Sequence, residues 1–309
     1  MSLSLEAAPL KSKAQVPIKQ PDSPWRIAIR RFARNRLALA GLLILVLMVL
    51  TCYIGPLLSP YNLNDYSVAD KNQAPSGKHW LGTDKLGRDV LLRVMLAGRI
   101  SIMVGVVATV ITVVLGATLG ALAGFYRKFI DSFIMRIAEI FMSIPTLPLL
   151  IILGALLSDL KVPPQDRIYF LMLILGILSW PGLSRLVRGQ ILTLREQEFM
   201  QATEALGLRD RRKIFRHLLP NTVPIIIVSA TLGVASAILA ESALSYLGLG
   251  VVPPTPSWGN MISEANGIIE FRKRPWLWIP PGTCILITVV AINLIGDGLR
   301  DALDPKMKK

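Results

Sequence analysis

Six long apolar stretches, separated by polar segments, dominate the chain. They run over about 37–58, 100–125, up to 157, 168–187, 223–243 and 276–295. A helix of roughly 20 residues crosses the hydrocarbon core of a bilayer, about 30 Å. The pattern therefore predicts an all-α, polytopic membrane protein in which residues 37–309 form one domain of six transmembrane helices.

The composition agrees with a membrane protein. Hydrophobic residues make up 52% of the chain and charged residues 17%, against roughly 25% charged in a soluble domain. The mean hydropathy is +0.53. The two cysteines, Cys52 and Cys284, fall inside apolar stretches and are expected to be small buried residues rather than a disulfide or a metal site.

The first 36 residues differ from the rest in being polar and basic. Residues 1–22 have no periodicity and predict a tail. Ser23 is placed to cap a helix that Pro24 begins, and its apolar side chains share one face, as in a helix lying on the membrane surface. The first apolar stretch is too long for a removable signal peptide and predicts an uncleaved anchor.

The distribution of basic residues sets the expected orientation. The net charge is +14, but the basic residues flank apolar stretches, which favours contact with lipid headgroups over nucleic acid. Lys and Arg number 22 in the termini and in the loops after spans two and four, against 11 in the opposite loops. Both termini and the 188–220 loop are therefore predicted to be cytoplasmic, and loops 59–99 and 244–275 external.

The spans themselves contain few candidates for chemistry. Pro145 and Pro148 should bend the third span and free backbone carbonyls. Glu241, near the external end of the fifth span, is a candidate for the transport path or for capping a turn. Arg136 and Glu139 lie three residues apart in the third span and can pair with each other.

Glycines in the second span have a structural interpretation. Gly116, Gly120 and Gly124 are spaced four apart and should let another helix approach closely. The two histidines, His79 and His217, fall on opposite sides of the predicted membrane. They therefore cannot share a metal ion, and no metal site is expected.

The cytoplasmic segment 188–220 predicts two short helices. Thr193 and Glu196 have the spacing of a capping box, which predicts a helix from Leu194 to Leu206. Gly207, followed by an apolar residue, suits a left-handed helix C-cap. Asp210 can cap a second helix that is apolar on one face and basic on the other.

This segment resembles the permease subunits of ATP-binding-cassette (ABC) importers. Their cytoplasmic loop carries E-A-A, three residues, G, nine residues and I-x-L-P, and here Gln201-Ala202-Thr203, Gly207 and His217-Leu218-Leu219-Pro220 have the same spacing. In that family the short helix docks in a groove on the ATPase subunit. The resemblance therefore implies a coupling role for Glu198, Gln201, Ala202, Thr203, Glu204, Ala205 and Gly207.

The predicted external loop 59–99 and three other stretches point to one group within this family. The stretch HWLGTDKLGRDVLLRVMLAGRIS, with ESALSYLGLGVVPPTPSWG, PGLSRLVRGQIL and GDGLRDALDP, resembles the oligopeptide, dipeptide and nickel permease group, in particular its second permease. The likeness covers roughly residues 25–305. The signature residues are His79, Leu81, Gly82, Thr83, Asp84, Gly87, Arg88 and Asp89, for which an ordering or docking role is expected over substrate binding.

The resemblance also implies partners and a location. These are a second, homologous permease, two ATP-binding subunits that hold ATP and Mg, an extracytoplasmic solute-binding protein and a peptide substrate, in the cytoplasmic membrane of a prokaryote. No cofactor is expected on this chain.

An enzyme is not expected, since the chain has no phosphate-binding loop, H-E-x-x-H or G-x-S-x-G motif. Two other functions stay open. One is a permease for nickel or another small solute, and the other is a channel or scaffold that works without ATP.

Overall fold

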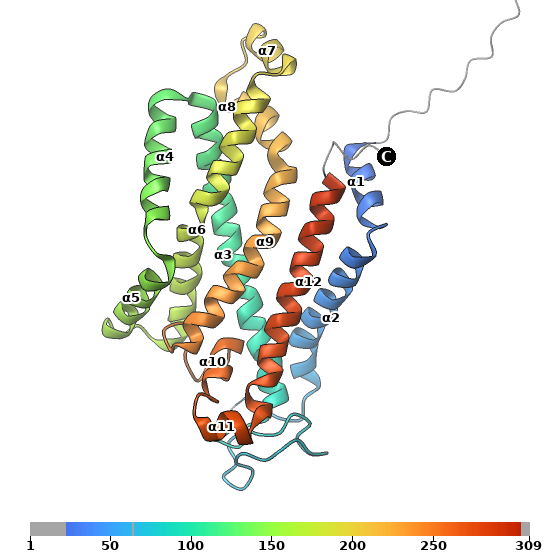
Figure 1. Cartoon of the computed structure of the whole chain (residues 1–309), viewed down its shortest axis with the longest axis vertical. Helices are drawn as coiled ribbons and strands as arrows, with labels where there is room; N and C mark the ends of the chain where they lie inside the picture. The colour runs from blue at the N-terminus through green and yellow to red at the C-terminus, as the bar shows by residue number, and fades with distance from the viewer. Residues whose placement is uncertain (1–22, 64, 304–309) are drawn as a thin grey trace, which may run out of the picture.

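The computed structural model describes residues 23–63 and 65–303, and over them the protein is almost entirely helical (Figure 1). Five long helices are α2 (Arg36–Leu58), α3 (Val90–Tyr126), α6 (Pro164–Arg195), α9 (Leu219–Tyr246) and α12 (Ile279–Leu303). The shorter ones are α1 (Pro24–Phe32), α4 (Lys128–Ser143), α5 (Thr146–Asp159), α7 (Glu198–Ala205), α8 (Asp210–Arg212), α10 (Trp258–Ser263) and α11 (Ile268–Lys273). The predicted tail, residues 1–22, lies outside the described residues.

Among the described residues, five helices are long and apolar enough to cross a membrane. A sixth crossing is made if α4 and α5, which are bent by 81° at a short break, form one span. The break falls at Ile144-Pro145, because proline lacks the N–H that a continuous helix needs. The predicted six-span fold and the bend in its third span are thus confirmed.

Several boundaries differ from those expected. The second span is α3, which begins ten residues before the expected Ile100, so the loop that was predicted to be external ends at Asp89. Asp89 caps α3, since its Oδ1 accepts a hydrogen bond from the Leu92 amide at 2.8 Å. Pro181 lies inside α6 without interrupting it.

The glycine stripe of α3 packs against α6. A Cβ on Gly120 would lie 2.5 Å from the Ser184 carbonyl oxygen, and a Cβ on Gly124 would lie 2.8 Å from the Cβ of Ile191. Only glycine permits this approach of the two backbones. The predicted packing role of the stripe is therefore confirmed, and α3 and α6 form the closely packed centre of the bundle.

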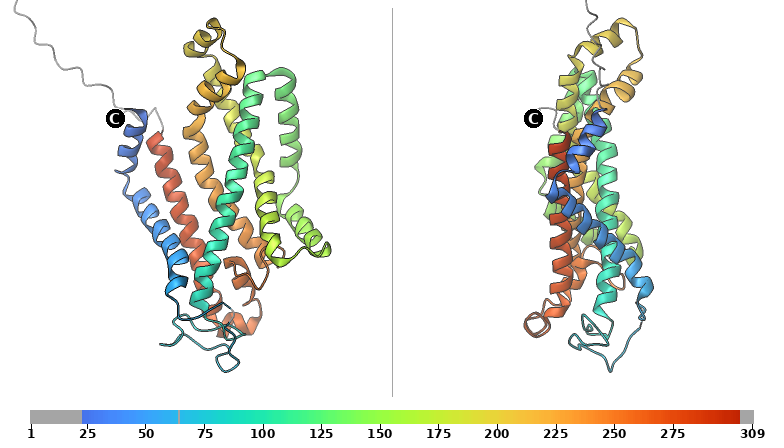
Figure 2. Two further views of the ribbon diagram at one scale, coloured as in Figure 1. Left: turned by 180° about the vertical axis from the view of Figure 1, so that it is seen from behind. Right: turned by 90° about the vertical axis from the view of Figure 1, so that its right-hand side faces the viewer.

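The remaining helices flank this centre. Figure 2 shows α2 beside α12 at one side, with α4 and α5 at the opposite edge. At one end of the bundle lie α7, α8, α1 and the last turns of α12; α10, α11 and the 59–89 loop gather at the other end. The described parts of both termini therefore share one end with the 188–220 segment, as predicted.

Candidate functional site

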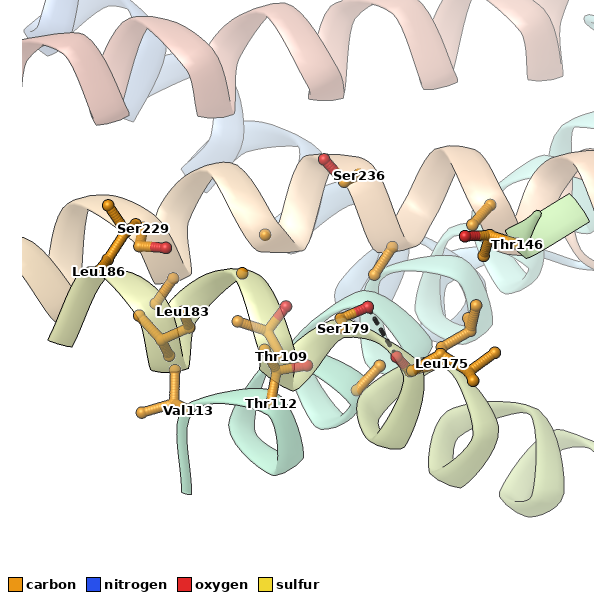
Figure 3. Close-up of a pocket in the computed structure, with 17 residues that line it drawn as sticks. Thr109, Thr112, Val113, Thr146, Leu175, Ser179, Leu183, Leu186, Ser229 and Ser236 are labelled. Atoms are coloured by element: carbon orange, nitrogen blue, oxygen red, sulfur yellow. Dashed lines mark hydrogen bonds between the residues drawn. The ribbon is translucent and has the colours of Figure 1, made fainter. Parts of the chain in front are cut away.

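A cavity of about 450 Å³ opens between α3, α5, α6 and α9 (Figure 3). Its wall includes six hydroxyl side chains, namely Thr109, Thr112, Thr146, Ser179, Ser229 and Ser236. The other lining residues are apolar or glycine, and no charged side chain of the described chain lines the cavity. The wall is therefore weakly polar and uncharged.

Helix carbonyls accept hydrogen bonds from several of these hydroxyls. Ser179 donates to the Leu175 oxygen at 2.8 Å, and Thr112 donates across the helix contact to the Gly176 oxygen at 3.1 Å. Such bonds let hydroxyls sit inside apolar helices without an unpaired donor. These residues were not predicted from the sequence, because isolated Ser and Thr in an apolar stretch look the same whether they face a cavity or a neighbouring helix.

The break between α4 and α5 brings the third span to the cavity. Thr146, the first residue of α5, lines it, whereas Pro145 and Pro148 are exposed and do not. The two prolines thus affect the cavity only through the bend in the backbone, and the side chain of Thr146 lines its wall.

Glu241 does not line the cavity, although its neighbour Ala240 does, and it is fully buried. Its carboxylate accepts hydrogen bonds from the hydroxyls of Ser101 on α3 and Ser245 on α9, both at 2.7 Å. The same two hydroxyls also accept hydrogen bonds from backbone amides. Ser101 accepts from the Trp258 amide at 3.3 Å, and Ser245 accepts from the Val251 amide at 2.9 Å. Glu241 therefore fastens the 247–258 segment to α3 and α9 rather than facing the described cavity.

Two of the signature residues, Asp84 and Arg88, belong to a buried network of four charges. Asp84 Oδ2 accepts from Arg88 Nε at 2.6 Å and from Arg93 Nη1 at 2.7 Å. Glu264, from the segment between α10 and α11, accepts from Arg93 Nη2 at 2.6 Å. The two acids and two arginines cancel in charge, so each has a partner away from water. Arg93 and Glu264 were not among the predicted residues, because only the fold brings them together.

The rest of the signature shapes the loop. His79 Nδ1 lies 2.9 Å from Asp89 Oδ2, so the carboxylate accepts from a protonated Nδ1. Gly82 and Gly87 have φ of +71° and +79°, a conformation that favours glycine. Thr83, like Asp84, is completely buried. The structure therefore brings the signature residues together in an ordered turn that leads directly into the first turn of α3.

Further contacts hold residues 61–78 of the loop in place. The Tyr61 ring stacks on His79 with centroids 4.8 Å apart, and its hydroxyl donates to the Lys78 carbonyl oxygen at 2.5 Å. Hydrogen bonds from Lys78 and Ser67 lower the pKa of Asp70. Asp70 is therefore held ionised, and its pair with Lys78 ties two parts of the loop.

At the opposite end of the bundle, α7 differs from the helix predicted there. The expected capping box is wrong: Thr193 lies inside α6, its hydroxyl donates to the Gly189 carbonyl oxygen, and α6 continues to Arg195. Gly207 has φ of +64°, and the Leu208 amide donates to the Thr203 oxygen at 3.2 Å. The predicted left-handed C-cap is thus confirmed, as a Schellman motif.

The two faces of α7 are distinct. Met200 and Thr203 are buried, and Met200 packs with Ile214 and Leu218 of the helix that leads into α9. The remaining predicted coupling residues are exposed, namely Glu198, Gln201, Ala202, Glu204, Ala205 and Gly207. Leu206, which was not among the predicted residues, is 76% exposed at the helix end.

The second predicted helix is continuous with α9, from Asp210 to Tyr246.

The described residues contain no group of three or more His, Cys, Asp or Glu side chains placed to hold a metal ion.

Comparisons with known proteins agree with this architecture. Residues 116–309 match the family described as binding-protein-dependent transport system inner membrane component. Residues 23–75 match the N-terminal transmembrane domain of oligopeptide transport permease C.

Full-length relatives are named as peptide permeases. The chain is 40% identical to the dipeptide transport system permease protein DppC of Alkalihalophilus pseudofirmus, over 93% of this chain and 91% of the relative. It is 39% identical to the oligopeptide transport system permease protein OppC of Bacillus subtilis, over 94% and 92%. It is 38% identical to the glutathione transport system permease protein GsiD of Escherichia coli, over 95% of each chain. The chain therefore belongs to the inner membrane components of binding-protein-dependent transport systems, within their group of oligopeptide and dipeptide ABC permeases.

Proposed function

We propose that this chain forms half of the translocation path of an ATP-driven peptide importer and that α7 couples the path to an ATPase subunit. The observation that carries the proposal is the course of α6. This single helix lines the cavity with residues from Leu175 to Leu186, and it ends two residues before α7. A push on α7 therefore reaches the cavity wall through one continuous helix.

The chemistry of α7 suits docking in a groove of another protein. Met200 and Thr203 anchor the helix to the bundle, which leaves the opposite face free for a partner. On that face, the carboxylates of Glu198 and Glu204 and the apolar side chain of Leu206 offer charged and apolar contacts. ATP and Mg would be held by two partner ATPases, whose closure would move α7 and α6 together.

At the opposite end, the ordered 59–89 loop and the 247–278 segment offer a stable surface for an extracytoplasmic solute-binding protein. A second, homologous permease would complete the path, with both termini of this chain in the cytoplasm of a prokaryote. The substrate class follows the relatives, named for dipeptide, oligopeptide and glutathione transport. The hydroxyl-lined wall is suited to the uncharged main-chain amides that all peptides share.

The test of this assembly is purification in mild detergent through a tag after Lys309, followed by mass spectrometry of the proteins that accompany the chain. We expect a second permease and two ATPases. A chain that purifies alone, or only with copies of itself, under conditions that preserve membrane complexes would refute the importer and favour an ATP-independent channel or scaffold. Competition of uptake by peptides and by nickel then separates the peptide permease from a nickel permease.

A further inference from the structure

An ion pair joins α4 to α6 at the end of the bundle that carries α7. Arg188 Nε lies 2.5 Å from Asp131 Oδ1, and Arg188 Nη2 lies 2.6 Å from Asp131 Oδ2. The side chains of Arg188 and Asp131 are 34% and 16% exposed, so the pair is partly shielded from water. Two parallel hydrogen bonds fix both the distance and the orientation of the two groups.

On one side of this pair lies a unit that should move as one body. The glycine stripe holds α3 against α6, and Arg127 of the α3–α4 turn pairs with Glu196 just before α7. Arg195, the last residue of α6, donates to the Phe125 carbonyl oxygen near the end of α3. The base of α7 is therefore fastened to α3 as well as to α6.

On the other side lies the bent third span. Asp131 is in the first turn of α4, and α4 leads through the break at Ile144-Pro145 to Thr146 in the cavity wall. Below this ion pair, α4 and α6 meet through apolar contact, for example between Phe141 and Trp180 with ring centroids 5.9 Å apart. A longer and half-exposed ion pair, 3.9 Å between Glu139 Oε1 and Arg185 Nη2, also joins the two helices. Apolar contact is not directional, and an exposed ion pair contributes little to structure, so the Asp131–Arg188 pair is the strongest directional contact between the two helices.

We propose that Asp131 and Arg188 are positioning residues that make α4 follow α6, so that displacement of α7 also moves α5 and its part of the cavity wall. This proposal rests on the proposed function, because it needs an ATPase to move α7. It adds a second route from α7 to the cavity, beside α6 itself.

A nearby ion pair provides the matched control. Arg136 and Glu139 both belong to α4, lie 3.2 Å apart and are 79% and 50% exposed. Exposed pairs contribute little to structure, and this one joins no two helices. Replacing Arg136 with Gln therefore removes a charge from α4 while the Asp131–Arg188 pair and the 3.9 Å pair of Glu139 with Arg185 on α6 stay in place.

The experiment uses the complete transporter, purified with its co-purifying subunits and reconstituted in proteoliposomes. Uptake of a radiolabelled tripeptide and ATP hydrolysis are measured for wild type, Asp131→Asn, Arg188→Gln and Arg136→Gln. We expect the first two variants to keep hydrolysing ATP while peptide uptake per ATP falls at least about fivefold, the lower end of typical coupling between sites. Arg136→Gln should keep the wild-type ratio.

A distance measurement makes the test independent of how well the variants assemble. Spin labels are placed at Phe133→Cys on α4 and Gly189→Cys on α6, in a background with Cys52 and Cys284 replaced by Ala. Phe133 is 58% exposed, and a side chain added at Gly189 meets no atom within 4 Å. In the wild-type pair we expect the distance between labels to stay the same with and without ATP.

The outcomes separate the two proposals. A wild-type distance that changes with ATP by more than about 5 Å, one helical turn, would show that α4 does not follow α6 and would overturn the proposal. Wild-type uptake per ATP in both Asp131→Asn and Arg188→Gln would also overturn it. If the wild-type transporter itself shows no ATP-dependent peptide uptake, the proposed function fails rather than the link between α4 and α6.

Discussion

Substitution of Gly207 tests the link between backbone conformation and transport. Gly207 ends α7 with φ of +64° and continues the chain toward α8. An ideal Cβ added there meets no atom within 4 Å, so a larger residue causes no clash with other parts of the protein. Within this chain, an effect of substitution therefore arises from the left-handed backbone conformation itself.

The expected cost can be worked from this geometry. A residue with a Cβ pays roughly 1–2 kcal/mol in the left-handed region, less for Asn and more when the side chain is β-branched. A helix of only 8 residues has little stability of its own, so this cost falls directly on the folded fraction of α7. A loss of 1–2 kcal/mol lowers the ratio of folded to unfolded α7 by about 5- to 30-fold.

The assay is ATP-dependent peptide uptake by the reconstituted transporter for Gly207→Asn, Gly207→Ala and Gly207→Val. We expect uptake to fall in that order, with Asn nearest to wild type and Val lowest. The matched control is Gly189→Ala, which also adds a methyl group where no atom lies within 4 Å but lies inside a helix. There alanine favours the fold by about 0.5–1 kcal/mol, so uptake should be unchanged.

Equal uptake by the Gly207 wild type and the Val variant, with the same amount of assembled complex, would refute the reasoning. It would mean either that α7 folds without its C-cap or that coupling does not pass through α7. Equal loss in the Asn and Val variants would contradict the conformational explanation, because Asn adopts the left-handed region readily.

Three further outcomes are expected. Glu264→Gln should lower the stability of the purified complex by about 3 kcal/mol, measured by thermal unfolding, because the buried Arg93 loses one of its two charged partners and keeps only Asp84; an unchanged unfolding temperature would contradict this. Gly120→Val should prevent assembly, scored by co-purification, because its Cβ would press on the α6 backbone, whereas Gly189→Ala should assemble normally. Deleting residues 1–20 should leave peptide uptake largely intact, and loss of the complex would show that the tail contacts a partner.

Apolar periodicity and turn chemistry predicted most of the fold. The long spans follow from the length of the apolar stretches, the break in the third span follows from Pro145, and the end of α7 follows from Gly207. Each of these depends on local sequence. The Thr193 capping box failed because the contact of α6 with α3 extends the helix through a site that could have begun a new one.

The candidate site was less accessible to sequence reasoning. The hydroxyls of the cavity come from distant parts of the chain, such as Thr109 on α3 and Ser236 on α9, which are 127 positions apart (236 − 109), and only packing brings them together. The same holds for Arg93 and Glu264, whose ion pair spans 171 residues. A cavity and a long-range ion pair are properties of tertiary structure, which no local spacing reveals.

Uptake by the reconstituted transporter tests the central claim most directly. The complex that co-purifies with this chain is placed in proteoliposomes with its solute-binding protein, and accumulation of labelled di- and oligopeptides is followed with and without ATP and Mg. The account predicts uptake that requires ATP and that unlabelled peptides, but not nickel ions, compete away. Peptide flux that proceeds equally without ATP, or uptake that nickel alone competes away, would contradict it.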